Sequence, residues 1–440
     1  MIKTYKICDI IDSYISGDWG NDCTTDDTPH PVYCVRGADI VPTSNSQFND
    51  IPLRYVSKRS FQTRCLQEGD IIIEKSGGSP TQSTGRMVYV SKELLSAKKN
   101  IVCSNFCTAF RVKEGWNAHY VFLYLQNVYN SGVFFNFEGK TSGLKNLMMD
   151  AAFKSIPIKK IPIAKQTDLA VSISAIDKKL SLNRQTNDNL EVMAKQLYDY
   201  WFVQFDFPNE EGKPYKSNGG AMVWNEKLKR EIPQGWDISD VKSLIEPIER
   251  GVSYSSDEIL DMSATPMINL ACFSKAGDYR LGEMKFFSGN IPETKLISPM
   301  DMLIACTDMT QGADIIGRPI LASNEFDQYT FSTDLALVIP KGKLKMYLYY
   351  TLRTPFYHKY IRPFASGTTV KHLNLIGVEN YVLPIPPMGI QSKFEDTISP
   401  IKEQQSKNLN EIVALTKQRD ELLPLLMNGQ ASVNYHLSDD

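Results

Sequence analysis

The stretch TSGLKNLMMDAAFKSIPIKKIPIAKQ (Thr141–Gln166) recurs later in the chain as ASGTTVKHLNLIGVENYVLPIPPMGIQ (Ala365–Gln391). Both copies carry Ser-Gly, then Lys-x-Leu, an apolar run, Ile-Pro and a final glutamine. The two glutamines lie 225 residues apart, and the following segments keep this offset, for example from Asn183 to Asn408. A period of this length indicates duplicated domains rather than a solenoid.

Length and composition limit what this duplication can be. The chain has 440 residues, which is too many for one hydrophobic core and predicts two or more domains. Its net charge of −2 excludes a polycation that coats nucleic acid, so any nucleic-acid binding must use local patches. The start, MIKTYKICDIIDSY, lacks the apolar core of a signal peptide, and no window reaches the length of a membrane span. We therefore expect a cytoplasmic protein.

The eight cysteines form no Cys-x-x-Cys pair. In a reducing compartment such cysteines behave as small buried apolar residues. A zinc site built from Cys103, Cys107 and His119 is the alternative, but structural zinc sites usually show two close pairs of ligands. We therefore predict no metal site.

Each copy begins with a strand-rich part. Runs such as GDIIIEK, RMVYVSK, CTAFRVK and, in the second copy, STDLALVIPKG place β-branched residues between turn residues. A helix of about 35–40 residues follows, from near Gln166 to near Phe205 in the first copy, and it spans on the order of 55 Å. Because such a helix outreaches its own domain, we expect the two long helices to pair as an antiparallel coiled coil. The alternative is that each helix packs only on its own globular part.

Apolar residues in both helices are spaced alternately three and four positions apart, which is typical of a helix–helix seam. Asn183, Asn187 and Asn408 interrupt the series, and buried asparagines of this kind help to fix register. Pro400 predicts a start or a kink in the second helix. The apolar positions are Leu169, Ile173, Ile176, Leu180, Leu190, Ala194, Leu197 and Trp201 in the first helix, and Phe394, Ile398, Ile401, Ile412, Leu415 and Leu422 in the second.

The central stretch LEVMAKQLYDYWFVQFDFPNEEGKPYKSNGGAMVWNEKLKREIPQGWDI (Leu190–Ile238) resembles the central region of type I restriction–modification DNA specificity subunits. The resemblance covers nearly the whole chain. It includes the duplication, the long helix that starts with glutamine after each Ile-Pro segment, and the Ile-Pro-x-Gly-Trp sequence at Ile232–Trp236. The first half departs from this pattern because it lacks the Pro-x-Gly-Trp sequence.

This resemblance implies an α+β protein with two α/β target recognition domains in tandem duplication, related by a pseudo-twofold axis. Each domain would read one half of a split DNA sequence, and the two long helices would set the distance between the halves. The implied segments are recognition domain 1 (1–164), spacer helix 1 (165–206), an elbow linker (207–231), recognition domain 2 (232–387), spacer helix 2 (388–427) and a C-terminal tail (428–440). With the pseudo-twofold arrangement, the half-sites would lie about one DNA turn apart, near 34 Å.

The resemblance also implies that the chain is not an enzyme and binds no cofactor itself. Two modification subunits, which bind S-adenosylmethionine, would dock on it and methylate adenine. Two restriction subunits would use ATP and Mg²⁺ for translocation and cleavage. A runner-up function is an orphan scaffold or decoy that binds modification subunits without productive DNA recognition.

Motifs for catalysis are missing from the sequence. It contains no Asn/Asp-Pro-Pro-aromatic loop of an adenine methyltransferase, and no G-x-G-x-x-G follows a predicted strand. The Gly-Lys-Thr at 139–141 is not a phosphate loop, because Phe134 stands where the upstream glycine is required. Glu138–Lys140 and Glu293–Lys295 lack the upstream Pro-Asp of a nuclease site, and we interpret both as surface turns.

Two loops in each half are candidates for DNA contact, because they are rich in glycine and in small hydrogen-bonding side chains. The first loop spans Ser76–Arg86 and has Thr307–Arg318 as its counterpart, and the second is the Ser-Gly turn of the repeat. The alternative is that all four are solvated turns. The candidate DNA-binding residues are Ser76, Ser79, Thr81, Gln82, Arg86, Lys140, Ser142 and Lys145 in the first half, and Thr310, Gln311, Arg318, Thr368, Thr369, Lys371 and His372 in the second. The basic run of Arg54, Lys58, Arg59 and Arg64 is a weaker candidate for phosphate contact.

An aromatic cluster closes the first long helix. Its members are candidates for docking a modification subunit, although core packing alone explains most of them. The polar run Asn209–Gly220 that follows is predicted to be a linker. The docking candidates are Tyr198, Tyr200, Trp201, Phe202 and Phe205.

Overall fold

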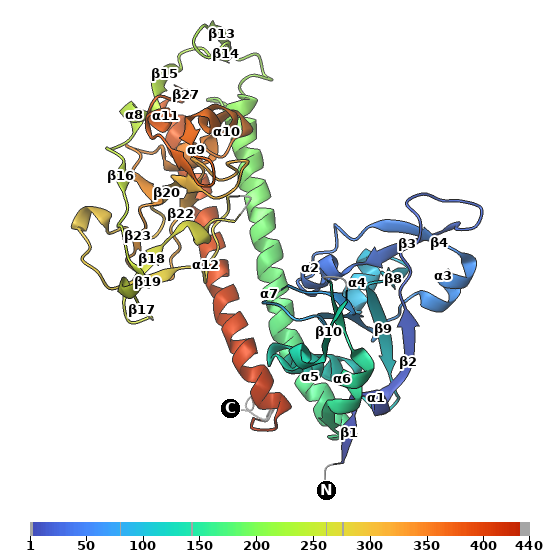
Figure 1. Ribbon diagram of the computed structural model, residues 1–440. Coiled ribbons are helices and arrows are strands. Elements are labelled where there is room, and N and C mark those ends of the chain that lie inside the picture. Colours follow the sequence, from blue (N-terminus) through green and yellow to red (C-terminus); the bar gives the residue numbers. More distant parts are fainter. Residues whose placement is uncertain (1–2, 80, 142–143, 261, 275–276, 432–440) are drawn as a thin grey trace, which may run out of the picture. The chain divides into compact units, whose positions relative to one another are not determined.

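The computed structural model in Figure 1 describes residues 3–79, 81–141, 144–260, 262–274 and 277–431. The chain divides into two compact units: unit 1 comprises Met1–Leu182 with Leu415–Asp440, and unit 2 comprises Asn183–Ala414. The two long helices are α7 (Ile163–Tyr198) and α12 (Met388–Met427), and each contributes to both units. No helix in the described part of the chain combines the length and the apolarity that a membrane span requires.

The described residues of unit 1 form four sheets. Their strand orders are β2-β9-β5-β7, β4-β3-β8, β10-β11-β6 and β1-β12. The strands are β1 Thr4–Lys6, β2 Ile11–Ser16, β3 His30–Val35, β4 Leu53–Val56, β5 Ile71–Glu74, β6 Ser76–Gly77, β7 Met87–Tyr89, β8 Ile101–Cys103, β9 Cys107–Val112, β10 Glu138–Thr141, β11 Leu144–Leu147 and β12 Pro157–Lys159. The shorter helices are α1 Ile7–Ile10, α2 Ile40–Ser44, α3 Lys58–Arg64, α4 Lys92–Ala97, α5 Ala118–Asn130 and α6 Met149–Ser155.

In unit 2, the part of the chain that the structure describes forms four corresponding sheets and one additional hairpin. Their orders are β16-β24-β20-β22, β17-β19-β18-β23, β21-β26-β25 and β15-β27, with hairpin β13-β14. The strands are β13 Met222–Asn225, β14 Arg230–Pro233, β15 Asp237–Asp240, β16 Glu249–Arg250, β17 Ile259–Leu260, β18 Thr265–Ile268, β19 Lys285–Phe287, β20 Met302–Ala305, β21 Thr307–Asp308, β22 Pro319–Leu321, β23 Thr330–Phe331, β24 Leu335–Val338, β25 Ala365–Ser366, β26 Lys371–Leu373 and β27 Val382–Ile385. The shorter helices are α8 Val241–Leu244, α9 Lys345–Thr351, α10 Pro355–Ile361 and α11 Ile376–Glu379.

The duplication seen in the sequence is therefore also a duplication of topology. In the central sheet of each unit the third strand carries an unbroken apolar run: Ile71–Ile73 in β5 and Met302–Ala305 in β20 are all buried. Such continuous apolar runs are expected where both faces of a strand are covered. The predicted α+β architecture with two strand-rich domains and two long helices is confirmed.

In unit 1 the two long helices pack through apolar side chains. Leu169 and Ile173 of α7 lie in the same core cluster as Leu423 and Leu426 of α12. Arg419 of α12 adds an ion pair with Asp177 of α7 at 3.2 Å. As the residue numbers increase along α7, the numbers of the contacting residues on α12 decrease, so the two helices run antiparallel.

In unit 2 polar contacts join α7 and α12 beside the apolar ones. Asn183 donates to Glu411 at 2.8 Å, and Asn408 donates to Asn187 at 2.8 Å. Asn187 and Gln405 exchange two further bonds through side-chain amides and backbone carbonyls, at 3.0 and 2.9 Å. The predicted interrupting asparagines are thus in the seam, but Asn183 and Asn408 bond other residues and not each other.

The prediction that the second helix starts or kinks at Pro400 is wrong about the start. Helix α12 begins at Met388 and continues through Pro400. The lost backbone hydrogen bond costs on the order of 3 kcal/mol in a helix interior. Phe394 and Ile398, which precede the proline and are fully buried in the core of unit 2, stabilise this first part of the helix and offset that cost.

The aromatic cluster lies in the core of unit 2. Helix α7 ends at Tyr198, a single π turn covers Asp199–Val203, and Phe205 has a positive φ of 64°. The helical stretch therefore runs to Val203, close to the predicted end near Phe205. Phe202 packs edge-on against Tyr347 and Phe394, with ring centroids 4.7 and 4.8 Å away.

Four of the five docking candidates, Tyr198, Trp201, Phe202 and Phe205, are buried, and Tyr200 is 36% exposed. Their core packing is confirmed, and docking through them stays a prediction.

The polar run after the cluster is an ordered loop. Asp206 accepts hydrogen bonds from the backbone and hydroxyl of Ser217, at 2.7 and 2.5 Å. Phe207 stacks on Tyr215 at 4.7 Å, and Trp236 of the Ile-Pro-x-Gly-Trp sequence is buried beside Phe207. The segment predicted to be a linker is thus held against unit 2 and leads into hairpin β13-β14.

We expect His119 to make unit 1 sensitive to acid. Its ring stacks on Tyr89 at 4.6 Å and lies 3.0 Å from the Ser174 hydroxyl, and burial lowers the pKa of His119 from 6.5 to about 4. The unfolded chain takes up a proton that the folded unit excludes, so the free energy of unfolding decreases as pH falls from about 6.5 towards 4. Thermal unfolding at pH 7 and pH 4.5 should show a smaller acid shift for His119→Gln than for the parent protein, while His372→Gln, at an exposed site, should behave like the parent.

Candidate nucleic-acid interface

In unit 1 the two candidate loops form one sheet. Strand β6 starts the first loop and pairs with β11 of the repeat turn, with Gly77 opposite Lys145 and Ser76 opposite Asn146. The Ser76 hydroxyl also donates to the Asn146 side chain at 2.5 Å. Residues that are about 70 positions apart in the sequence thus lie side by side in one three-stranded sheet, β10-β11-β6.

Unit 2 repeats this arrangement. Strand β21 starts the first loop and pairs with β26, with Thr307 opposite His372 and Asp308 opposite Lys371. Gly367 forms the turn before β26 with a φ of 123°, and a Cβ there would lie 1.9 Å from the carbonyl oxygen of Val370, so only glycine fits. The Ser-Gly of the repeat is therefore required by the turn itself in this unit.

Glu138 joins the loop to the hairpin in unit 1. Its carboxylate accepts from the backbone of Thr84 at 2.7 Å and pairs with Lys145 at 2.9 Å, and its side chain is only 9% exposed. Burial alone would raise the pKa of Glu138, but Lys145 and Thr84 hold it below its usual value. The interpretation of Glu138–Lys140 as a surface turn is wrong, because these residues form strand β10. Glu293–Lys295 forms a turn of 3-10 helix, with no residue buried.

Arg86 is held by a buried carboxylate. Its guanidinium donates to both oxygens of Glu74, at 2.9 and 2.5 Å, and the Glu74 side chain is 2% exposed. The hydrogen bond to Glu74 raises the pKa of Arg86, although burial opposes this shift. Arg86 thus braces the base of the loop, and its position leaves little of the guanidinium for a ligand.

The four residues of the basic run Arg54, Lys58, Arg59 and Arg64 differ in their exposure to solvent. Arg54 is buried and donates to the carbonyl oxygens of Trp19 and Gly20, at 3.0 and 3.3 Å. Arg64 donates to the carbonyl oxygen of Gly17 at 2.7 Å. Only Lys58 and Arg59, on α3, are exposed. The last two are the members of the run that a phosphate can reach.

The loop tip in unit 1 is the exposed part of the candidate set. Thr81 and Gln82 are exposed, and Ser79 accepts from the Gln82 backbone at 3.1 Å and lies 3.3 Å from the Thr81 hydroxyl. Lys140 belongs to β10, and Ser142 lies outside the described residues.

A residue that the sequence reasoning missed lies beside this loop. Phe106 is 58% exposed, and its carbonyl oxygen accepts from the backbone of Lys75 and Ser76, at 2.8 and 3.2 Å. An exposed aromatic side chain on a backbone fixed in this way is suited to apolar contact with bases. The signal in the sequence was a phenylalanine within the polar run Ser-Asn-Phe-Cys between two predicted strands.

In unit 2 the exposed candidates are Gln311, Thr368, Thr369 and His372. Thr310 shapes the first loop, because its hydroxyl accepts from the Asp314 backbone at 3.1 Å and its own N–H donates to Asp308 at 2.6 Å. Lys371 donates to the carbonyl oxygen of Gly367 at 2.5 Å. The candidates therefore divide into residues that shape the loops and residues that present side chains to solvent.

Arg318 and Arg86 occupy equivalent positions in different surroundings. Ala305 stands in unit 2 where Glu74 stands in unit 1. Instead Arg318 packs on Gly277, where a Cβ would lie 2.8 Å from the arginine Cδ. Burial and the charge of Arg353 lower the pKa of Arg318.

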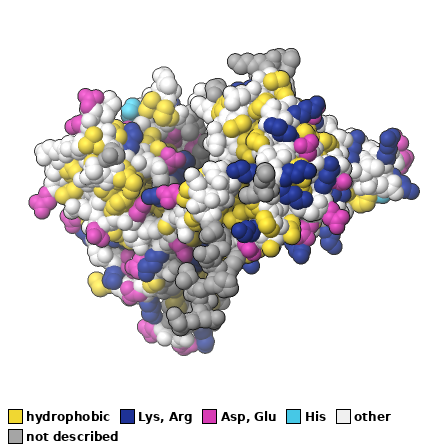
Figure 2. Space-filling view, turned by 90° about the horizontal axis from the view of Figure 1, so that it is seen from below, with side chains coloured by type: hydrophobic (Ala, Val, Ile, Leu, Met, Phe, Trp, Pro, Cys, Tyr) yellow, Lys and Arg dark blue, Asp and Glu magenta, His cyan; other side chains and the backbone are white. Residues whose placement is uncertain are grey.

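The described residues give no sign of a metal site. They include no group of three or more His, Cys, Asp or Glu arranged to hold a metal ion. Burial raises the pKa of the Cys103 thiol, and that of Cys107 to about 11, as expected of small buried apolar residues. On the face drawn in Figure 2, Lys and Arg side chains are interspersed with acidic ones. Two units of one topology, each with a polar three-stranded sheet that carries exposed Thr, Gln or His side chains, define a duplicated recognition protein.

Comparisons with known proteins identify the family. The type I restriction modification DNA specificity domain family matches residues 43–192. The specificity subunit of the type I restriction enzyme MjaIX from Methanocaldococcus jannaschii is 27% identical over 277 residues, which cover 61% of this chain and 59% of that subunit. The HindI specificity subunit of Haemophilus influenzae is 22% identical over 467 residues, covering 91% of this chain and 94% of that subunit.

A solved structure shares the fold. The S subunit of a type I restriction–modification system from M. genitalium aligns over 97% of this chain and 96% of its own length, with a TM-score of 0.59 and 13% identity. The chain belongs to the DNA specificity subunits of type I restriction–modification systems. It is the non-catalytic component that determines DNA target recognition in such a system.

Removing Arg86 should destabilise unit 1 before it changes any binding. In Arg86→Met the Glu74 carboxylate stays buried without its cation, a change that typically costs about 3–5 kcal/mol. The double variant Glu74→Gln/Arg86→Met should recover part of this loss, because it removes the buried charge. Urea unfolding measures both, with Gln82→Ala at an exposed site as the control. Equal stability of Arg86→Met and the parent protein would contradict a bracing role.

Proposed function

We propose that each unit reads one half of a bipartite DNA target. Unit 1 uses the loop 76–86 and the hairpin 138–147, and unit 2 uses the loop 307–318 and the hairpin 365–373. The observation that carries this proposal is the repeated three-stranded sheet, β10-β11-β6 and β21-β26-β25, which joins both candidate loops within each unit. The exposed candidate residues on these loops (Thr81, Gln82, Gln311, Thr368, Thr369 and His372) carry hydroxyl, amide and imidazole groups, which suit contacts to base edges and phosphates.

The two long helices set the length of the non-specific spacer in this proposal. Supporting it, α7 and α12 contact each other through Asp177–Arg419 in unit 1 and through Asn183–Glu411 in unit 2.

The partners follow from membership of the family. Two modification subunits bind S-adenosylmethionine, dock on this chain and methylate adenine, and restriction subunits supply ATP- and Mg²⁺-dependent translocation and cleavage. The chain itself holds no cofactor and acts in the cytoplasm, where the DNA is. Tyr200, the most exposed of the aromatic docking candidates, is the residue of that group that a modification subunit would reach first.

Co-expression with the cognate modification subunit, followed by methylome sequencing, tests the whole proposal. A DNA-reading subunit should give a split adenine motif with a fixed spacer. A scaffold or decoy, the runner-up, should co-purify with the modification subunit and give no motif.

Substitutions at the loop tips should act on one half of the motif only. The double variant Thr81→Ala/Gln82→Ala should relax the half read by unit 1, and Gln311→Ala/Thr368→Ala the half read by unit 2, because each base contact contributes about 1–3 kcal/mol. Methylome sequencing of each variant measures base preference at both halves. If either variant alters both halves equally, the assignment of one unit to one half-site is wrong.

An insertion in the middle of α7 should lengthen the spacer. Four residues inserted between Ser181 and Asn189 add about 6 Å of helix, close to two base-pair steps of DNA. Four residues inserted into the turn between β13 and β14, at 226–229, serve as the control and should leave the spacer unchanged. An unaltered motif after the α7 insertion would refute the spacer role of the helices.

A further inference from the structure

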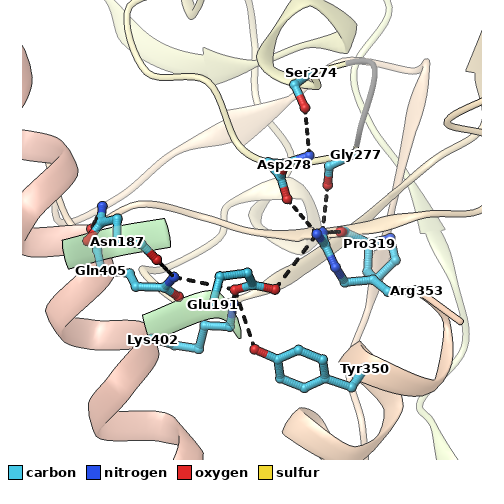
Figure 3. Close-up of polar contacts among 10 residues, drawn as sticks. All are labelled: Asn187, Glu191, Ser274, Gly277, Asp278, Pro319, Tyr350, Arg353, Lys402 and Gln405. Atoms are coloured by element: carbon cyan, nitrogen blue, oxygen red, sulfur yellow. Dashed lines mark hydrogen bonds and ion pairs between the residues drawn. The ribbon is translucent and has the colours of Figure 1, made fainter. Parts of the chain in front are cut away.

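Arg353 follows α9 at the centre of a polar cluster in unit 2, and Figure 3 shows the ten residues involved. Its side chain is only 13% exposed. The guanidinium donates to the carbonyl oxygen of Gly277 at 2.7 Å and to the Asp278 carboxylate at 2.5 Å. One arginine thus bonds both the backbone and a side chain of the segment Gly277–Asp278.

On its other side Arg353 reaches the long helices. The nearest oxygen of Glu191 on α7 lies 3.9 Å from the guanidinium. The Glu191 carboxylate also accepts from Lys402 and Gln405 of α12, and from the Tyr350 hydroxyl at 3.5 Å (Figure 3). Burial alone would raise the pKa of Glu191, but Lys402 and Arg353 hold it below its usual value, so the carboxylate remains charged.

The Arg353 guanidinium also contacts two residues that lie next to Arg318. It lies 3.5 Å from the carbonyl oxygen of Pro319, the residue that follows Arg318. It also fixes Gly277, and Gly277 is in contact with the Arg318 side chain, because a Cβ at 277 would lie 2.8 Å from the arginine Cδ. A change in the position of Arg353 therefore displaces the backbone of Pro319, next to Arg318. It also displaces Gly277, which the Arg318 side chain contacts.

The two residues at the centre of this cluster are of other types at the corresponding positions of unit 1. Aligning HYVFLYL (119–125) with MYLYYTL (346–352) puts Gln126 at the position of Arg353, and the 225-residue offset puts Thr416 at the position of Glu191. In unit 1 the equivalent arginine, Arg86, is held by Glu74 from the adjacent strand. The link from the long helices to the recognition loop is thus specific to unit 2.

We propose that Arg353 is a positioning residue for the half-site read by unit 2. It holds Gly277, Asp278 and Pro319 around Arg318, and through Glu191 it ties this arrangement to α7 and α12. The inference rests on the proposed function, and it adds that the second half-site depends on residues that do not touch DNA.

The test compares Arg353→Met, Arg353→Lys and Glu191→Gln in the assembled complex with the modification subunit, with Gln126→Ala as the matched control. Methylome sequencing gives base preference at each half-site, and thermal unfolding gives stability. Arg353→Met should lower discrimination at the second half-site by about tenfold, the scale of one lost base contact, and should leave the first half-site intact. Arg353→Lys keeps the charge but lacks the planar five-donor guanidinium that reaches the two carbonyl oxygens and the carboxylate at their separate positions, so its effect should be intermediate. Glu191→Gln should act in the same direction more weakly, and Gln126→Ala should change neither half.

Three outcomes would overturn the inference. The first is an unchanged second half-site in folded Arg353→Met. The second is equal relaxation of both halves. The third applies if Arg353→Met does not fold: Glu191→Gln then decides, and a parental motif in that variant rejects the positioning role. Failure of the proposed function is distinguishable, because the parent protein itself would then give no split motif.

Discussion

The antiparallel contact between α7 and α12 is the constraint on which both units depend. The core of unit 1 includes Leu169 of α7 and Leu423 of α12, and the core of unit 2 includes Ala194 of α7 and Phe394 of α12. Neither core can close with one half of the sequence alone. Each unit therefore needs contacts between residues that are 200 or more positions apart, which predicts slow, late assembly of the helix seam after the local sheets have formed.

Carboxylates paired with lysine or arginine support the loops and the long helices of this scaffold. Glu74, Glu138 and Glu191 are each held by a lysine or an arginine from another element. Removing a charge from water is costly, and the pair compensates only when the geometry is good, so such pairs contribute more to a defined arrangement than to net stability. A recognition loop has few apolar residues to hold its shape, and these ion pairs take that role at its base while the tip stays exposed.

The sequence predicted what depends on local pattern and periodicity. The duplication, the strands around Ile71–Ile73 and the two long helices follow from repeated spacing of apolar residues, and all are found. The sequence could not predict which lysines and arginines form ion pairs with carboxylates of the same chain. Arg86 and Lys145 look like surface cations until the fold places Glu74 and Glu138 beside them.

The aromatic cluster shows the same limit. Its spacing indicated burial, and burial is observed, but the partners Tyr347 and Phe394 lie about 150–190 residues further along the chain and no local signal names them.

The duplicated units keep their backbone pairing and change their internal supports. Both retain the three-stranded sheet that joins the loops, because strand pairing is made by backbone groups and tolerates changes of side chain. The arginine after the first loop is braced by Glu74 in unit 1, whereas in unit 2 Ala305 replaces that glutamate and Arg353 shapes the surroundings of Arg318 instead. The arginine is thus held by different residues in the two units. A substitution of Glu74 changes only unit 1, and a substitution of Arg353 changes only unit 2. The side chains on each pair of loops can therefore change independently while the sheet, the helices and the seam stay the same, which is the property that a protein with two separate half-sites requires.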